Sequence, residues 1–223
     1  MGNRSKGSAV GKRKRRVRSE AMHREIDPKI MYFGTPVVLI STANEDRSPN
    51  LAPMSSAWWL KKSCMLGLGT RGKTFENLKR ERECVLNLPS SEMVSAVDRL
   101  ALTTGKNPVP EYKVEMGFQY IADKFGRAGL TAVDSQLVRP PRVGECPVQL
   151  EAVVENIHHF GETESGLASI EVRIIRVYFD DNILDQEKRH YVDTDKWKPL
   201  IMSFCEFYGV GAKLYPSKLA KVF

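Results

Sequence analysis

The sequence predicts a mainly β fold with α insertions, built as an antiparallel barrel with helical excursions. About six runs of β-branched and apolar residues are spread along the chain, and most of them are joined by turns. The helical patterns are few and stand between these runs. The regular alternation of strand and helix that a doubly wound parallel sheet needs is missing from the sequence pattern.

The composition is that of a globular protein. Of the 223 residues, 42% are hydrophobic and 27% are charged, which allows a sizeable core. No stretch reaches the roughly 18 consecutive apolar residues of a membrane helix, and no apolar segment follows the basic N-terminus as in a secretory signal. The widely spaced cysteines predict free thiols, buried in apolar runs at Cys64 and Cys84, in a reducing, cytoplasmic compartment, with no zinc site. The four cysteines are Cys64, Cys84, Cys146 and Cys205.

The basic charge is concentrated at the N-terminus. Residues 1–20 hold eight Lys or Arg and one Glu, so this segment alone accounts for the net charge of +7. We expect residues 1–25 to form a disordered basic tail and residues 26–223 to form one domain. The run KRKRRVR at 12–18 is typical of a nucleic-acid or anionic-surface patch. A solubilising tail is favoured, because no aromatic or Gly-rich binding context surrounds the run.

The first half of the chain predicts a hairpin, a short strand and a helix. PVVLIST at 36–42 is a β-branched run, the polar turn NEDRSPN follows it, and extended character resumes at 51–59. Residues 64–69 read as a short strand. In KTFENLKRERE at 73–83, Phe75 and Leu78 stand at helical spacing among charges, which predicts an exposed amphipathic helix.

The second half predicts further strands around a loop-rich segment. CVLNLP at 84–89 reads as a strand, and residues 90–105 as a helix that Ser91 caps and Gly105 closes. Residues 106–146 are rich in loops, with a short helix near 118–128. The remaining elements are two long strands at 147–161 and 166–184, joined by GETESG as a hairpin loop, and an apolar end at 197–211 that packs onto the core or a partner.

Residues 67–74 match the phosphate-loop pattern G-x-x-x-x-G-K-[ST] after a strand and before a helix. The hairpin upstream opposes a P-loop nucleotide hydrolase, which needs βαβ alternation. Gly67 and Gly69 also fall inside the strand, which leaves too short a cradle. Thr70, Lys73 and Thr74 at a helix start can still bind a phosphate. The alternative is a helix capped by Thr70 with solvated charges.

NLAPMSSAWW, the strand ending in GLGT, and KTFENLKRERECVLNLP resemble the flavin reductase-like family with the FMN-binding split barrel. That family includes flavoredoxins and the reductase components of two-component flavin monooxygenases. The likeness extends through PEYKVEMGFQYIADKFGRAGLTAV and ECPVQLEAVVE, over roughly residues 30–180. It implies a six-stranded antiparallel split β-barrel that binds FMN. One departure is Arg71, Gly72 and Lys73, where many members have Ser or Thr.

The resemblance also implies the site. It assigns one segment to the isoalloxazine ring and a second to the phosphate, and it implies no catalytic side chain because the flavin does the chemistry. His158 and His159 face opposite ways on a strand, so no joint metal site is expected. The expected ring residues are Met54, Ser55, Ser56, Ala57 and Trp58, and the expected phosphate residues are Thr70, Lys73 and Thr74, with Asn77 nearby.

By resemblance, the chain is an NAD(P)H-dependent flavin oxidoreductase that passes electrons to free flavin, oxygen or a partner monooxygenase. NADH or NADPH is the expected donor, and a homodimer with FMN at its interface is the expected assembly. The apolar residues 201–210 fit burial by a partner. Three alternatives stay open: a non-catalytic FMN electron carrier, a split-barrel binder of haem or a deazaflavin, and a P-loop nucleotide hydrolase.

Overall fold

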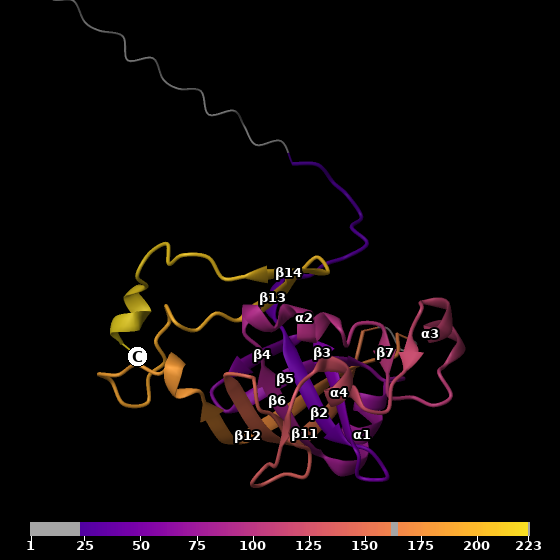
Figure 1. The fold of residues 1–223 in the computed structure, drawn as a ribbon. Helices are drawn as coiled ribbons and strands as arrows, with labels where there is room; N and C mark the ends of the chain where they lie inside the picture. Colours follow the sequence, from indigo (N-terminus) through magenta and orange to yellow (C-terminus); the bar gives the residue numbers. More distant parts are fainter. Residues whose placement is uncertain (1–22, 162–164, 223) are drawn as a thin grey trace, which may run out of the picture.

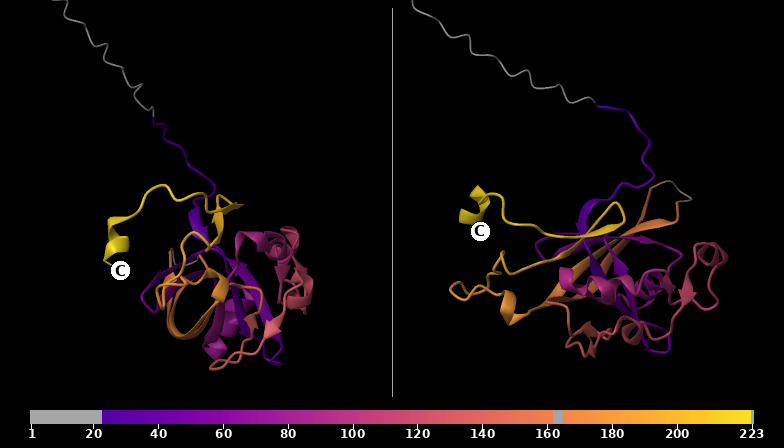
Figure 2. Two further views of the ribbon diagram at one scale, coloured as in Figure 1. Left: turned by 60° about the vertical axis from the view of Figure 1, so that its left-hand side comes forward. Right: turned by 45° about the horizontal axis from the view of Figure 1, so that its top comes forward.

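The computed structural model describes residues 23–161 and 165–222. Its centre is one antiparallel seven-stranded sheet in the order β3-β2-β6-β11-β12-β5-β4, which curls around the core (Figures 1 and 2). The edge strands β3 and β4 do not pair with each other in this sheet, so the barrel is split, as expected. The strands are β2 Val38–Ala43, β3 Pro49–Met54, β4 Ala57–Leu60, β5 Ser63–Gly69, β6 Glu83–Leu88, β11 Val148–Phe160 and β12 Leu167–Phe179.

The sheet has one strand more than the six expected, because the extended segment 51–59 is divided in two. The break falls at Ser55 and Ser56, where the Ala57 N–H donates to the Ser55 carbonyl at 3.0 Å instead of to a neighbouring strand. β3 pairs with β2, and β4 pairs with β5. The chain therefore turns a corner at these serines and leaves their backbone at an open edge.

The core has two parts, and β2 is buried between them. Val38 and Ile40 belong to the cluster inside the barrel, and Val37 and Leu39 belong to the cluster outside it. Burial on both faces explains why the run 36–42 reads as continuously apolar. The long hairpin of β11 and β12 is confirmed, and it completes the wall of the barrel.

Helix α1, Lys73–Glu81, packs against β2 and β3 with Phe75 and Leu78 buried, as expected. The helix expected over 90–105 is wrong in extent. A 3₁₀ turn at Ser91–Met93 leads into α2, Val94–Asp98, and Ser90 rather than Ser91 stands at the start. The chain then leaves the helical conformation, because Leu102 has a φ of 51° and Thr103 begins the short strand β7, Thr103–Thr104.

The remaining elements are short and lie around the barrel. β1, β13 and β14 form a small second sheet that brings Leu200 into the outer core cluster. The apolar end therefore packs back onto the body, and the last residues extend away from it (Figures 1 and 2). No described helix is long and apolar enough to cross a membrane. The predicted tail lies almost wholly in residues 1–22, outside the described residues. The short elements are β1 Phe33–Pro36, α3 Glu111–Glu115, β8 Gln119–Tyr120, α4 Lys124–Ala128, β9 Ala132–Val133, β10 Arg142–Val143, η2 Asp181–Ile183, β13 Leu200–Ser203, β14 Glu206–Gly209 and η3 Lys218–Lys221.

Candidate functional site

An apolar groove of ≈ 400 Å³ lies at the corner between β3 and β4. Met54, Ser55 and Ser56 form one wall, and the end of β5 forms another. The Ser56 hydroxyl shares a 2.8 Å hydrogen bond with the Tyr32 hydroxyl, which fixes the corner to the segment before β1. Met202, Cys205 and Phe207 of the β13–β14 hairpin complete the lining. The groove thus combines apolar side chains with the backbone of a strand end.

The β5 end of this groove is bare backbone. Gly67 and Gly69 stand two residues apart, on the same face of the strand. A Cβ at Gly67 would lie 3.0 Å from the Ser56 Cβ, whereas a Cβ at Gly69 would meet no atom within 4 Å. Gly67 therefore allows the close approach of Ser56, whose carbonyl accepts from the Gly67 N–H at 2.7 Å. Gly69 leaves open space for a flat ligand.

A second depression, the outer groove of ≈ 510 Å³, adjoins the first and shares Ser56 and Gly67 with it. Ala57 and Trp58 line it, so all five residues expected at the ring line one of the two grooves. Trp58 is 59% exposed here, whereas Trp59 packs against the barrel core. Trp58 therefore faces the outer groove, and Trp59 does not.

The cationic hollow, ≈ 310 Å³ in volume, continues from the apolar groove, and Leu68 and Gly69 line both. Arg71, Lys113 and Lys124 stand in its wall together with the hydroxyl residues Thr74 and Thr104. None of its lining residues is Asp or Glu. A hollow of this charge, beside an apolar groove, suits an anionic group at the end of a flat apolar ligand.

Lys124 is the most informative residue of the cationic hollow. The residue is 3% exposed, and its Nζ forms no hydrogen bond or ion pair among the described residues. The Nζ is not among the polar atoms that are fully shielded from solvent, so it reaches the hollow. Burial lowers its pKa to about 8, and the nearby Lys113 ammonium adds to this. Burial also lowers the pKa of Lys113, whose Nζ lies 3.4 Å from the Thr104 hydroxyl. The nearby Glu76 carboxylate opposes the lowering of the Lys113 pKa, whereas no acidic group acts in this way on Lys124. A partly desolvated ammonium such as that of Lys124 favours a bound anion.

Arg71 stands at the mouth of the cationic hollow. Its guanidinium carbon lies 4.2 Å from the centre of the Tyr112 ring, which holds the side chain in place by a cation–π contact. Arg71 is, with Gly72 and Lys73, one of the three residues at which the sequence departs from the pattern that the resemblance implies. Arg71 therefore adds a cation to the wall of the cationic hollow.

The predicted phosphate residues are only partly brought together. Thr74 lines the cationic hollow, and so does the stem of Lys73. The Lys73 ammonium, however, forms a 2.6 Å ion pair with Glu45 outside that hollow. Thr70 does not line it, because its hydroxyl donates to the Gly166 carbonyl at 3.0 Å. Gly72 rather than Thr70 is the N-cap of α1, so the alternative role of Thr70 as a helix cap is wrong.

Asn77 lines none of the grooves and hollows described here. It is fully buried, and its Nδ2 donates to Thr42 at 3.0 Å and to Asn44 at 2.9 Å. Asn50 Nδ2 donates both to the same Thr42 hydroxyl and to Thr74 Oγ1. Asn77 therefore acts through this chain of hydrogen bonds, which holds the start of α1 against β2 and β3.

The match to the phosphate-loop pattern is divided among three elements. Residues 67–69 belong to β5, 70–72 form a turn, and 73–74 begin α1. The strands beside β5 are antiparallel to it, so the parallel βαβ unit of P-loop hydrolases is not built around this segment. The other cationic side chains of the hollow, Lys113 and Lys124, come from later segments of the chain.

Lys113 and Lys124 were not identified from the sequence. They lie about forty to fifty residues after the loop they face, in the segment 106–146 that was read as loop-rich. The one local signal is that Lys124 stands between the helix cap Asp123 and the buried Phe125. A lysine at the start of so short a helix is ordinarily solvated, so its burial follows only from the tertiary fold.

Comparison with known proteins places the chain in one family. Residues 30–204 match the family model described as the flavin reductase like domain. The chain is 40% identical over 191 residues to the uncharacterized protein YdfE of Bacillus subtilis (strain 168), which covers 86% of this chain and 91% of the relative.

Solved structures show the same fold at low sequence identity. Flavoredoxin of Desulfovibrio vulgaris (Miyazaki F) has a TM-score of 0.73 and 22% identity, covering 90% of this chain and 100% of its own. Nitrilotriacetate monooxygenase component B from Bacillus cereus has a TM-score of 0.66 and 18% identity, covering 84% and 89%. The NADH:FAD oxidoreductase SgcE6 of Streptomyces globisporus C-1027 has a TM-score of 0.61 and 12% identity, covering 86% and 99%. With a split barrel, a flat groove at the Ser55–Ser56 corner and a matching family model, the chain belongs to the flavin reductase-like family of flavin oxidoreductases.

Proposed function

We propose that the protein binds FMN and is reduced by NADH or NADPH, and that it passes the electrons to free flavin, oxygen or a partner monooxygenase. The isoalloxazine lies in the apolar groove and the phosphate in the cationic hollow. The observation that carries this placement is the position of Lys124. The residue is buried in the wall of the cationic hollow, and it forms no hydrogen bond or ion pair among the described residues. The adjoining apolar groove exposes the backbone of β5 at Gly69. The likeness to a NADH:FAD oxidoreductase and to a monooxygenase component supports the donor and the partner.

The residues fit the ring. The carbonyl groups along its edge can accept from the backbone N–H groups of Ser55 and Ser56, where β3 ends and before β4 begins. The carbonyls of the two serines already accept from Ala57 and Gly67. Small side chains at Ser55, Ser56 and Ala57 let the ring approach that backbone. Gly69 leaves the neighbouring β5 edge open. Met54 and Leu68 supply apolar contact at the sides of the groove.

The residues also fit the phosphate. Lys124 and Lys113 donate to it from the inner wall of the cationic hollow, and Arg71 closes the mouth. A phosphate with close to two negative charges favours the charged forms of both lysines. FMN, when bound, supplies the two-electron chemistry, and the protein binds it, orients it and excludes water from it. The proposal assigns no acid–base role to a side chain.

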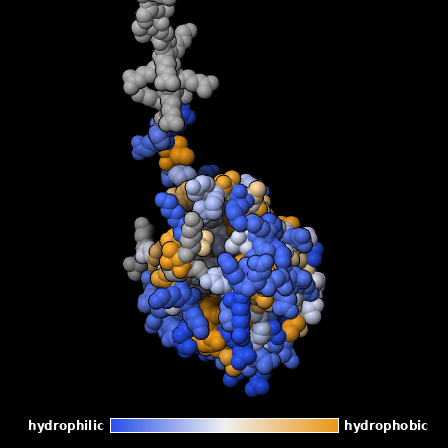
Figure 3. All heavy atoms as spheres, turned by 90° about the vertical axis from the view of Figure 1, so that its left-hand side faces the viewer, coloured by the Kyte–Doolittle hydropathy of each residue, from blue (hydrophilic) through white to orange (hydrophobic). Residues whose placement is uncertain are grey.

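A homodimer is the second part of the proposal. Trp58 is 59% exposed, Phe160 60% and Leu167 42%, and all three line the outer groove beside the ring position. Hydrophobic patches between hydrophilic areas are also visible on the face drawn in Figure 3. Large apolar side chains grouped around a groove favour burial by a protein partner. A second copy of the chain on this surface would cover the exposed side of the flavin.

Visible absorption spectra of the purified full chain test the reductase proposal. FMN is added first and NADH or NADPH second, without oxygen. The proposal predicts that FMN binds and that its visible bands bleach with one of the two donors. Bound FMN that neither donor bleaches would instead assign the protein as an electron carrier. No affinity for FMN would overturn the proposal, and another pigment in the purified protein would point to haem or a deazaflavin.

A further inference from the structure

The cationic hollow is bridged by a contact between the turn after β5 and helix α3. Arg71 belongs to the turn and Tyr112 to the first turn of α3, and both residues line the hollow. The Arg71 guanidinium carbon lies 4.2 Å from the centre of the Tyr112 ring. Neither residue lines the apolar groove, which meets the hollow at Leu68 and Gly69. The bridge therefore lies away from the end of the hollow that adjoins the ring position.

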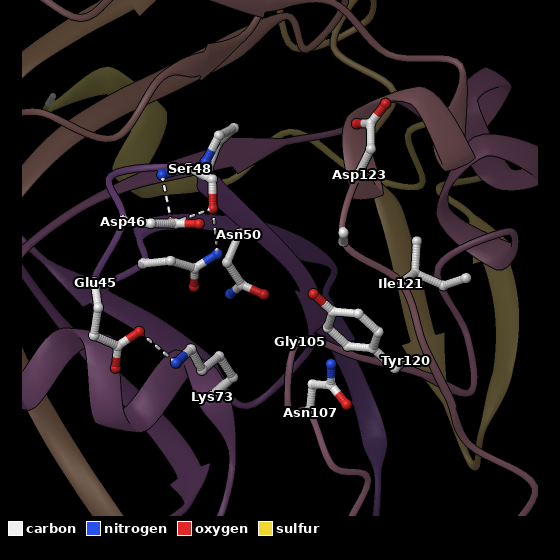
Figure 4. A pocket seen from close by; sticks show the side chains of 13 residues that line it. Glu45, Asp46, Ser48, Asn50, Lys73, Gly105, Asn107, Tyr120, Ile121 and Asp123 are labelled. Carbon is white, nitrogen blue, oxygen red and sulfur yellow. Dashed lines mark hydrogen bonds and ion pairs between the residues drawn. The ribbon is translucent and has the colours of Figure 1, made fainter.

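The wall of the hollow toward α1 is tightly packed. A Cβ at Gly105 would lie 2.7 Å from Asn50 Oδ1 and 3.1 Å from Lys73 Cγ, so the glycine backbone packs directly against both side chains. Gly105 and Lys73 also line a fourth depression of ≈ 570 Å³ behind this wall, where Figure 4 shows the Lys73 ammonium turned to Glu45. The carboxylates that line this depression are Glu45, Asp46 and Asp123. A packed wall backed by negative charge gives an anionic group no route in this direction.

The hairpin of β11 and β12 is linked to the same turn on another side of the hollow. The Thr70 N–H donates to the Gly166 carbonyl at 2.7 Å, and the Thr70 hydroxyl donates to the same oxygen at 3.0 Å. Gly166 also lines the hollow. The turn after β5 is therefore held from both sides, by the hairpin and by α3. A ligand whose ring lies in the apolar groove has its far end in this enclosed hollow.

The charge of the hollow suits a phosphate monoester better than a phosphate diester. Arg71, Lys113 and Lys124 stand in its wall, and none of its lining residues is Asp or Glu. A phosphate monoester carries close to two negative charges near neutral pH, whereas a phosphate that is linked on both sides loses one of them. The phosphate of FMN is a monoester. In FAD the same phosphate is linked to adenosine monophosphate, which adds both bulk and a second phosphate.

We propose that the Arg71–Tyr112 contact makes the cationic hollow a site for a terminal phosphate and thereby selects FMN over FAD. The inference rests on the proposed function, which places the flavin phosphate in this hollow. The adenosine monophosphate unit of FAD would have to continue past the phosphate, and the packed wall at Gly105 excludes the route toward α1. The other route passes between the turn and α3, so FAD binds at the cost of the cation–π contact.

Fluorescence titration of the full chain with riboflavin, FMN and FAD tests the inference. The wild type is expected to bind FMN about tenfold or more tightly than FAD. Tyr112→Ala removes the ring that Arg71 contacts and keeps every cation of the hollow. Its affinity for FAD should rise, and its preference for FMN should fall about threefold to tenfold. The affinity for riboflavin, which has no phosphate, should stay constant and shows that the apolar groove is intact.

Three further variants separate selectivity from a general effect on the fold. Tyr112→Phe keeps the ring face and should retain the wild-type preference for FMN. Arg71→Lys, at an exposed position, keeps the charge but loses the flat guanidinium, and should lower the preference as Tyr112→Ala does. Tyr215→Ala alters a tyrosine that is 80% exposed on the C-terminal segment, and should leave all three affinities unchanged.

Equal affinities for FMN and FAD in the wild type, or an unchanged preference in Tyr112→Ala, would overturn the inference. An equal loss of all three flavins in Tyr112→Ala would also overturn it, because the contact would then only support the fold. In each of these cases, binding of FMN by the wild type would leave the proposed function intact. A wild type that does not bind FMN would overturn the proposed function and the inference together.

Discussion

Lys124 shows how one side chain can set the conditions under which a ligand binds. The residue is buried near Lys113, and burial lowers its pKa to about 8 in the ligand-free protein. The residue faces Lys113, and Asp123 beside it in the chain accepts from Gly126 at 2.8 Å. A bound anion would therefore give this lysine an oppositely charged partner.

The affinity for FMN should depend on pH because of this lysine. Above about pH 8 the free protein holds Lys124 neutral, so binding of the phosphate requires proton uptake. The Kd of FMN should be nearly constant from pH 7 to 8 and should then rise by about tenfold per pH unit. Fluorescence titration of FMN across this range measures it. A flat profile, or an equally steep one in Lys124→Met, would contradict this role.

The stability of the ligand-free protein should rise with pH over the range in which the affinity for FMN falls. A lysine whose folded-state pKa is lowered binds fewer protons than in the unfolded chain, so stability rises with pH through the window between the two pKa values. The lower bound of that window is the lowered pKa of about 8, and the upper bound is the ordinary lysine pKa of 10.5. The Tm of the wild type should gain on that of Lys124→Met over this window, and a constant difference would contradict the prediction.

At the scale of elements, the corner between β3 and β4 and the end of β5 build the groove together. Gly67 and Gly69 lie on one face of β5, yet only Gly67 is pressed against the corner. Gly67→Ala should force the Ser56 backbone away and cost about 1–3 kcal/mol of stability. Gly69→Ala should change stability by about 0.5 kcal/mol or less, since its Cβ enters open space. Denaturant unfolding of both variants measures the contrast, and equal losses would contradict the proposed close contact.

The sequence predicted those elements whose signals are local. The run 36–42, the hairpin of 147–184 and the helix at 73–83 carry β-branched runs, turn residues or helical spacing, and all three are confirmed. The helix expected over 90–105 ends early because the left-handed conformation at Leu102 and the pairing of β7 with β8 depend on tertiary contacts. The division at Ser55–Ser56 likewise follows from two different neighbours, β2 and β5, that an isolated segment does not reveal.

For the candidate site as well, the sequence predicts residues that are adjacent in the chain and does not predict those that only the fold brings together. Met54, Ser55, Ser56, Ala57 and Trp58 are adjacent in the chain and line adjoining grooves, so a sequence motif could indicate them. Lys113 and Lys124 reach the cationic hollow only because residues 106–128 fold back over the loop after β5. Thr70 and Asn77 belong to the right segment, but their hydrogen bonds stabilise the hairpin loop and the helix start.

At the scale of the whole molecule, the exposed apolar surface around the outer groove should govern assembly. Sedimentation velocity of the FMN-loaded protein should show a dimer, and Trp58→Asp should shift it toward a monomer, because a charge in an apolar interface costs more than a surface substitution. Leu214→Asp, at a residue 98% exposed on the C-terminal segment, is the matched control and should remain dimeric. A monomeric wild type with FMN bound would contradict the homodimer.

The central claim is that the cationic hollow holds the phosphate of a flavin whose ring lies in the apolar groove. Its most direct test compares the Kd values of FMN and riboflavin for the wild type, Lys124→Met and Lys79→Met, where Lys79 is exposed on α1. The wild type and Lys79→Met should bind FMN more tightly than riboflavin. Lys124→Met should lose about tenfold to a hundredfold in affinity for FMN and keep its affinity for riboflavin, as removal of a charge-assisted hydrogen bond predicts. Equal affinities for FMN and riboflavin in the wild type, or an equal loss of both ligands in Lys124→Met, would contradict the claim.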